Sequence, residues 1–152
     1  MQHFQRIGIL AHPLRPLTVS LAQEVARFLE ERGVAAWVRD SWEATDARAL
    51  VPGSDLVIPI GGDGAMLHAA RVCAPHNVPV LGINTGHLGF LTEISPEEWS
   101  QGLQTLLDGR FWIEERMMIR CTVRRDGVPV VESEALNDVV ISRGTIAKLV
   151  QL

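Results

Sequence analysis

The sequence has 152 residues, of which 47% are hydrophobic and 21% are charged, and its formal net charge is −4. This composition is typical of a globular chain with a buried core, and the scattered arginines form no basic stripe of the kind that binds nucleic acid. No apolar run approaches the ~20 residues that span a bilayer, and the N-terminus lacks the features of a signal peptide. We therefore expect a cytoplasmic protein with no nucleic-acid and no membrane partner.

Cysteine and histidine spacing gives no sign of a metal centre. Cys73 and Cys121 are far apart in the sequence, and none of the five histidines has a zinc-type spacing. We expect reduced, packed cysteines and no structural metal.

The first half of the chain alternates apolar runs with helical patterns. Residues 6–10 predict a buried strand, followed by a loop in which Pro13 and Pro16 disfavour helix. A helix is expected from about Thr18 until Gly33, because apolar residues recur at helical spacing. Further strands are expected at residues 35–38, 56–60 and 78–83, and further helices at 47–50, from 65, and from Ser95 as N-cap to Asp108 and Gly109.

Strands that alternate with helices indicate an α/β fold with a parallel sheet and right-handed crossovers. Such sheets bind ligands at the carboxyl ends of their strands. Two of the predicted strands end in loops of small and polar residues, at 61–64 and at 84–90. We expect both loops to lie at the ligand-binding edge.

The pattern changes after residue 111. Residues 117–125 and 128–134 predict two strands joined by Asp126 and Gly127, a strong hairpin signal, and residues 135–141 predict a third. We expect an α/β nucleotide-binding domain at 1–112 and an antiparallel β-rich domain that begins at 113–152. Residues 148–152 begin another strand-like run, so we expect the chain to be the front part of a longer protein.

The loop after the strand at 56–60 carries the most informative chemistry. Gly61, Gly62 and Gly64 lack the side chains that would keep a ligand from the backbone, and a helix N-terminus that follows favours phosphate oxygens. Asp63 repels phosphate unless it holds a divalent cation or accepts a proton from a hydroxyl, both of which occur in phosphoryl transfer. The alternative is a glycine turn in which Asp63 caps the helix.

Two other phosphate-binding motifs do not match. The P-loop needs a lysine directly after its last glycine, whereas the only lysine here is Lys148. In the dinucleotide fingerprint, Leu67 stands where the third glycine is required.

Three segments together resemble the NAD kinase family, which phosphorylates the 2′-hydroxyl of the adenosine ribose of NAD. They are the glycine loop at 61–64, the segment 84–92, and the segment 135–141, where Asp138 stands in place of the usual glutamate. The glycine loop alone also occurs in lipid kinases and phosphofructokinases, whereas the segment 84–92 is specific. The resemblance runs from residue 7 to residue 152.

The resemblance implies Mg²⁺-dependent transfer of the ATP γ-phosphoryl group to NAD, giving NADP. Asp63 corresponds to the catalytic aspartate, as proton acceptor or metal contact, and the loop glycines admit the phosphates. Family members are usually homo-oligomers. The implied nucleotide-binding residues are Gly61, Gly62, Asp63, Gly64, Asn84, Phe90, Asn137 and Asp138.

Two alternatives remain open at this point. In the first alternative, the chain is a non-catalytic nucleotide-binding or regulatory module. In the second, it is a lipid kinase that shares the glycine loop. Because the family's later substrate loop lies beyond residue 152, we expect these 152 residues alone to be inactive.

Overall fold

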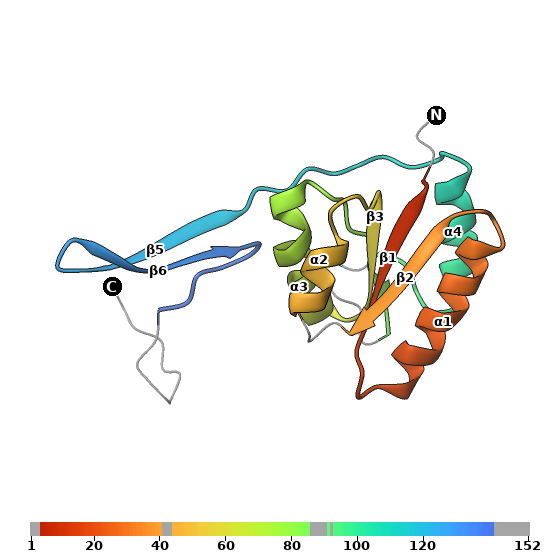
Figure 1. The fold of residues 1–152 in the computed structure, drawn as a ribbon, viewed down its shortest axis with the longest axis horizontal. Helices are drawn as coiled ribbons and strands as arrows, with labels where there is room; N and C mark the ends of the chain where they lie inside the picture. The colour runs from red at the N-terminus through yellow and green to blue at the C-terminus, as the bar shows by residue number, and fades with distance from the viewer. Residues whose placement is uncertain (1–3, 41–43, 86–90, 92, 142–152) are drawn as a thin grey trace. The chain divides into compact units, whose positions relative to one another are not determined.

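The computed structural model describes residues 4–40, 44–85, 91 and 93–141. The chain divides into two compact units, Met1–Glu114 and Glu115–Leu152. The first is an α/β unit and the second contains an antiparallel hairpin (Figure 1). The elements in chain order are β1 (Arg6–Ala11), α1 (Pro16–Glu30), β2 (Ala35–Asp40), α2 (Ala44–Leu50), β3 (Leu56–Gly61), α3 (Asp63–Cys73), the 3₁₀ helix η1 (Ala74–His76), β4 (Ile83–Asn84), α4 (Trp99–Leu107), β5 (Ile119–Arg125) and β6 (Val128–Ala135).

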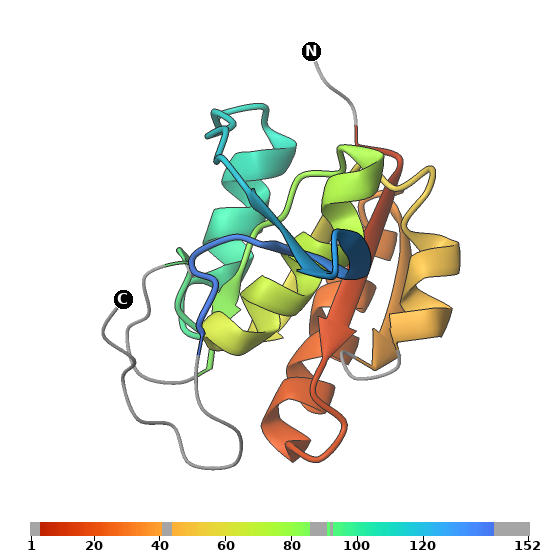
Figure 2. The same ribbon diagram turned by 90° about the vertical axis from the view of Figure 1, so that its left-hand side faces the viewer.

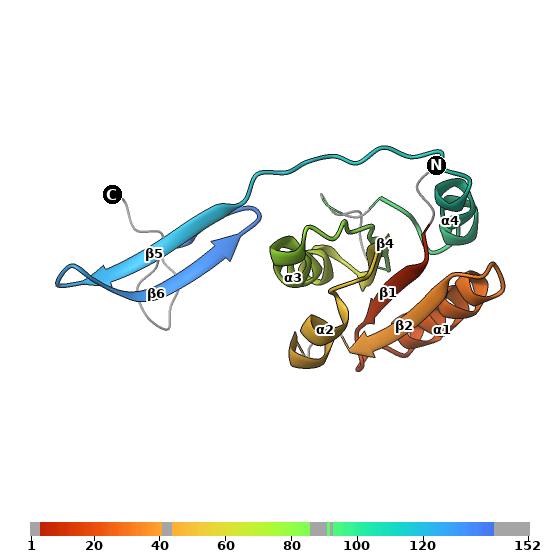
Figure 3. The same ribbon diagram turned by 45° about the horizontal axis from the view of Figure 1, so that its top comes forward.

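The first unit is built on a parallel sheet with strand order β2-β1-β3-β4. Helices α1 and α4 cover one face and α2 and α3 cover the other, which gives three layers (Figures 1 and 3). The predicted α/β class with a parallel sheet is confirmed. Among the described helices, none has both the length and the apolar character needed to cross a bilayer.

Burial on both sides explains the apolar run of the central strand. All six residues of β3 are buried, because β1 and β4 flank the strand and helices cover both of its faces. In α1 the buried side chains recur every three or four residues on the face that meets the sheet, and they are Thr18, Leu21, Ala22, Val25 and Leu29.

A glycine in β1 makes room for Trp37 of β2, which packs in the core between the sheet and helices α2 and α3. A Cβ added to Gly8 would lie 2.1 Å from Cζ2 of Trp37, so the indole packs directly on the backbone of β1. The indole Nε1–H of Trp37 donates to Oγ of Ser54 at 3.0 Å, and the Ser54 hydroxyl donates to the carbonyl of Leu50. This buried chain of hydrogen bonds fixes the end of α2 against the sheet.

Two predicted helix starts were wrong, both at prolines. Helix α1 begins at Pro16 rather than near Thr18, because proline needs no N–H at the first helical position. Helix α4 begins at Trp99 rather than just after Ser95. The Ser95 hydroxyl donates to the carboxylate of Glu98 at 2.9 Å within a separate turn, so it does not cap the helix.

The strand predicted at 78–83 is reduced to Ile83–Asn84 and an isolated bridge between Val57 and Val80. Pro59 explains the gap. Val57 and Gly61 direct their hydrogen-bonding groups toward this edge, bonding to residues 79, 81 and 85. Pro59 lies midway between them on the same side of β3, and it has no N–H to donate.

The second unit confirms the hairpin and corrects the strand that follows it. Asp126 and Gly127 have φ values of 50° and 81°, as a type I′ turn requires, and β5 pairs with β6. The strand predicted at 135–141 was wrong: β6 ends at Ala135, and the described residues after it bend at Leu136 and Asn137 and pair with no strand.

We predict that Gly8→Ala lowers the free energy of unfolding by about 1–3 kcal/mol, because the new methyl group overlaps the indole of Trp37. Urea unfolding of both proteins measures the difference. In a Trp37→Leu background the same change should cost less, as a double-mutant cycle will show. An equal cost in both backgrounds would contradict the overlap.

Candidate functional site

At the carboxyl ends of β1 and β3, the chain leaves the sheet toward opposite faces. From β1 the chain continues through α1 on one face, and from β3 it continues through α3 on the other, so the two loops diverge. Figure 2 shows the β1–α1 loop at the carboxyl end of its strand. A crevice at such a point is the usual ligand site of an open α/β sheet. Here it is a cavity of about 380 Å³, lined by His12, Arg15, Ile60, Gly61, Gly62, Gly64, Ala65 and His68.

The three loop glycines do different jobs. A Cβ at Gly61 would lie 2.8 Å from the Cβ of Ala65, so this glycine is needed for close contact between β3 and the first turn of α3. Among the described residues, a Cβ at Gly62 or Gly64 would meet no atom within 4 Å. Gly62 has a φ of −98°, which any residue adopts. Packing does not demand glycine at Gly62 or Gly64, and backbone conformation does not demand it at Gly62. The space beside both residues is open to a ligand.

Asp63 connects the glycine loop to the segment after β4. It is the first residue of α3, while Gly62 occupies the N-cap position, so the alternative in which Asp63 caps the helix is wrong. Its Oδ1 accepts a hydrogen bond from the backbone N–H of Leu91 at 3.2 Å. This bond orients the carboxylate toward the β4 side of the loop.

Asn84 lies at the same edge of the sheet. It is buried at the end of β4, opposite Gly61 in the strand register, and its N–H donates to the carbonyl of Ile94 at 2.8 Å. The next residue, Thr85, donates its N–H to the carbonyl of Gly61. The Thr85 hydroxyl is buried and has no hydrogen-bond partner within the described part of the chain.

The structure thus brings together five of the predicted site residues at one sheet edge: Gly61, Gly62, Asp63, Gly64 and Asn84. Phe90 lies outside the described residues. Asn137 and Asp138 are exposed residues of the second unit, after β6.

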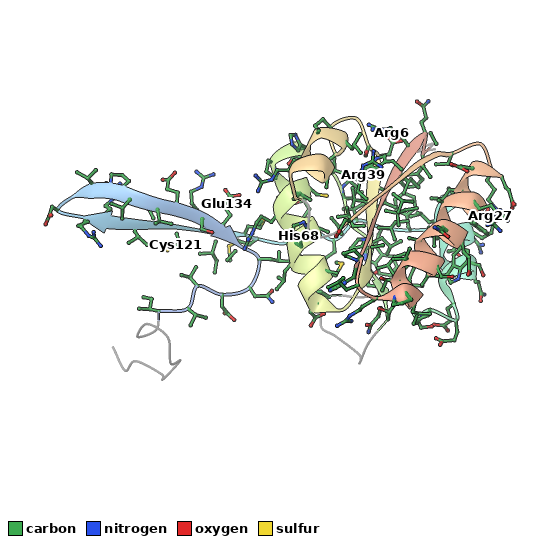
Figure 4. The ribbon with its side chains drawn as sticks, turned by 60° about the horizontal axis from the view of Figure 1, so that its bottom comes forward. Arg6, Arg27, Arg39, His68, Cys121 and Glu134 are labelled. Carbon is green, nitrogen blue, oxygen red and sulfur yellow. The ribbon has the colours of Figure 1, made fainter. Side chains whose placement is uncertain are left out.

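The sequence reasoning missed the arginine and the two histidines of the cavity. His12 and Arg15 follow β1. His68 lies about one turn into α3, where Figure 4 labels it. The sequence signal for His12 and Arg15 is their position directly after a predicted strand. Because β1 is the neighbour of β3, the loops after these two strands lie at the same edge of the sheet.

Burial and two arginines lower the pKa of His68. Burial contributes most, Arg71 and Arg48 act in the same direction, and Asp40 opposes them. The His68 Nε2 is buried without a hydrogen-bond partner among the described residues. The imidazole is therefore neutral at pH 7. No group of three or more metal-type side chains (His, Cys, Asp or Glu) gathers within the residues that the structure describes.

Comparison with known families assigns the chain to a family. The family model described as the ATP-NAD kinase N-terminal domain matches residues 7–111, more than half of the chain. The chain belongs to the ATP-NAD kinase family. It is 40% identical over 148 residues to an NAD kinase of Chloroflexus aurantiacus (strain ATCC 29366 / DSM 635 / J-10-fl), covering 97% of this chain and 54% of that protein. An NAD kinase of Pseudomonas fluorescens (strain SBW25) is 36% identical over 160 residues, covering 99% and 54%.

A solved structure shows that the fold is shared. Yeast NADH kinase, crystallised as a complex with NADH, matches with a TM-score of 0.64 at 20% identity, over 90% of this chain and 48% of that one. This member of the ATP-NAD kinase family spans about half the length of the curated relatives that it matches.

Alanine substitutions should distinguish the roles of the glycines in this loop of the ATP-NAD kinase family. We predict that Gly61→Ala lowers the free energy of unfolding by about 1–3 kcal/mol, because its methyl group overlaps Ala65. Gly62→Ala should change it by no more than about 0.5 kcal/mol, because the new methyl group meets no atom within 4 Å. Urea unfolding tests both, and equal losses would refute the distinction.

A second prediction concerns pH. Because the pKa of His68 is lowered in the folded state, the unfolded chain binds the proton more tightly, and stability falls as pH drops below the ordinary histidine value of 6.5. His68→Gln should reduce this loss. The control is His76→Gln, which changes an exposed histidine and should leave the fall in stability at low pH unchanged. Urea unfolding between about pH 7.5 and 5.5 checks it, and identical pH profiles for wild type and His68→Gln would contradict the assignment.

Proposed function

We propose that this chain carries the phosphoryl-transfer site of an NAD kinase, which moves the γ-phosphoryl group of ATP to the 2′-hydroxyl of the adenosine ribose of NAD and gives NADP. The observation that carries the proposal is the position of Asp63, a carboxylate between a glycine loop that is open to ligand and the segment after β4. The names of the relatives, each an NAD kinase, support it.

In this proposal Asp63 acts as the general base. A ribose hydroxyl is a poor nucleophile, and a carboxylate at hydrogen-bond distance takes its proton as the new bond to phosphorus forms. The N–H of Leu91 restrains one carboxylate oxygen, so the group is oriented before substrate arrives. Such preorganisation keeps the reacting groups in line without further ordering of the protein.

The loop and its neighbours bind the two nucleotides. The N-terminus of α3 and the open sides of Gly62 and Gly64 suit phosphate oxygens. Asn84, Phe90, Asn137 and Asp138 are assigned to the dinucleotide. Asn84 is fixed at the end of β4, where its burial favours hydrogen bonds to a ligand over contact with water.

A divalent cation fits the residues present. Mg²⁺ is generally held by one or two carboxylates together with substrate phosphates, rather than by a cage of protein ligands. The glycine loop offers one carboxylate, Asp63, next to the proposed phosphate site. When bound, Mg²⁺ would neutralise the charge that develops on the transferred group.

The whole protein is proposed to be a homo-oligomeric, cytoplasmic enzyme with an α/β domain at 1–112 and a β-rich domain that begins at 113–152. Residues 1–152 alone are proposed to be inactive.

The decisive variant is Asp63→Asn, which keeps an oxygen for the N–H of Leu91 and removes the base. We predict that it lowers kcat by roughly 10²–10⁴-fold with little change in the affinity for NAD. NADP formation from NAD, ATP and magnesium is measured with the gene product that contains this chain, expressed to its natural stop codon.

The matched control is Asp126→Asn, the same chemical change in the hairpin turn, where asparagine is also favoured. It should retain wild-type turnover. Wild-type turnover in Asp63→Asn would show that Asp63 is not the base. Nucleotide binding without NADP formation in the wild-type protein would instead support a regulatory module.

A further inference from the structure

Thr85 carries a buried hydroxyl that lacks a hydrogen-bond partner. Among the residues that the structure describes, two buried side-chain polar atoms have none, Nε2 of His68 and Oγ1 of Thr85. His68 lines the cavity beside the glycine loop, whereas Thr85 does not. Burial removes the bonds of a hydroxyl to water, so almost every buried hydroxyl in a folded protein is bonded to another group. The exception at Thr85 points to a partner that comes from outside the chain.

The pairing of the strands sets the position of Thr85. Its N–H donates to the carbonyl of Gly61 at 3.2 Å, which extends the pairing of β4 with β3 by one residue. On the other edge of β4, the N–H of Asn84 donates to the carbonyl of Ile94 at 2.8 Å. Thr85 therefore stands at the carboxyl end of a strand that is bonded on both sides, at the edge where an open α/β sheet binds its ligand.

Thr85 and the proposed base lie within reach of one sugar ring. Thr85 bonds to Gly61, and Asp63 follows Gly61 by two residues. Two residues of chain span at most about 7 Å, so Asp63 stays close to the end of β4. The side chains differ in what they bond, because a carboxylate only accepts hydrogen bonds, whereas a hydroxyl both donates and accepts.

The proposed acceptor presents two hydroxyls together. The adenosine ribose of NAD carries them on neighbouring carbons, at the 2′ and 3′ positions, and the 2′-hydroxyl is the one proposed to lie against Asp63. The 3′-hydroxyl then enters the same edge of the sheet and loses its bonds to water, which costs free energy unless the protein replaces them. A threonine hydroxyl suits it, since each group can donate to the other.

We propose that Oγ1 of Thr85 forms a hydrogen bond with the 3′-hydroxyl of the adenosine ribose and so holds the ribose with its 2′-hydroxyl against Asp63. The inference rests on the proposed kinase function and adds to it an acceptor-binding residue. Thr85 takes no part in proton transfer, which remains with Asp63.

The first test concerns the ligand-free protein. Thr85→Val replaces the unpartnered hydroxyl by a methyl group of similar size, so we predict that it raises the urea concentration at the midpoint of unfolding. The matched control is Thr105→Val, because the Thr105 hydroxyl donates to the carbonyl of Gln101 at 2.9 Å within α4. The control should not raise the midpoint. A lower midpoint in Thr85→Val would show that its hydroxyl is already bonded without ligand and would overturn the premise.

The second test is kinetic and uses the gene product expressed to its natural stop codon. Thr85→Val should raise the KM for NAD about threefold to tenfold, as expected for loss of one neutral hydrogen bond, and leave the KM for magnesium-ATP unchanged. Thr85→Ser keeps the hydroxyl and should restore most of the affinity. Thr105→Val should change neither KM. An unchanged KM for NAD in Thr85→Val would overturn the site.

An NAD analogue that lacks the 3′-hydroxyl of the adenosine ribose tests the partner of Thr85. In calorimetric titrations without a phosphoryl donor, the wild type should bind the analogue about threefold to tenfold more weakly than NAD. Thr85→Val should bind NAD and the analogue equally, because the bond is already lost in the variant.

These titrations involve no phosphoryl transfer, so they separate the inference from the kinase proposal. The same loss of affinity for the analogue in wild type and Thr85→Val would refute the contact even if the protein forms NADP. A loss seen in the wild type and absent from Thr85→Val would support the contact even if the protein forms none.

Discussion

The site depends on a connection of one residue between a buried strand and a helix. β3 ends at Gly61 and α3 begins at Asp63, so only Gly62 lies between them. The turn is this tight because Gly61 has no Cβ to collide with Ala65 in the first turn of the helix. With β3 held on both edges and both faces, the direction of α3 is fixed, and with it the position of the carboxylate at its first residue.

This tight turn also separates charges of opposite sign. The carboxylate of Asp63 is held toward the backbone of Leu91, while the guanidinium of Arg15 lines the cavity on the β1 side. In the phosphoryl transfer proposed above, an anionic donor must come close to Asp63, a base that is itself anionic. The turn places Arg15 on one side of the loop and the carboxylate of Asp63 on the other.

Pattern and spacing predicted the parts of the fold that depend on local sequence. The alternating apolar runs gave the parallel sheet, and Asp126 with Gly127 gave the hairpin, because each signal follows from burial or from a backbone conformation that few residues adopt. The errors arose where one residue's hydrogen bonding decided the outcome. Pro16 starts a helix, and Pro59 interrupts the backbone hydrogen bonds between two strands. In a sequence pattern, both prolines simply indicate that a helix or strand is broken.

The residues of the candidate site could be anticipated only in part, for a different reason. The glycine loop and Asn84 belong to motifs that the sequence displays, whereas Arg15 and His12 reach the cavity only through the adjacency of β1 and β3. Strand order is a tertiary property, which the pattern of strands and helices alone does not determine. The charge state of His68 likewise depends on Arg48 and Arg71, which gather around it only in the folded chain.

The missing N–H of Pro59 has a consequence for motion. Backbone hydrogen bonds join β3 to residues 79–85 near Val57 and near Gly61, with Pro59 between these two places, whereas β1 is paired to both of its neighbours along most of its length. Local opening costs least free energy where the ladder is interrupted. The edge of the sheet that carries Asn84 and Thr85, beside the glycine loop, therefore lies along the seam that opens at the lowest cost in free energy, while β1 and β3 remain paired.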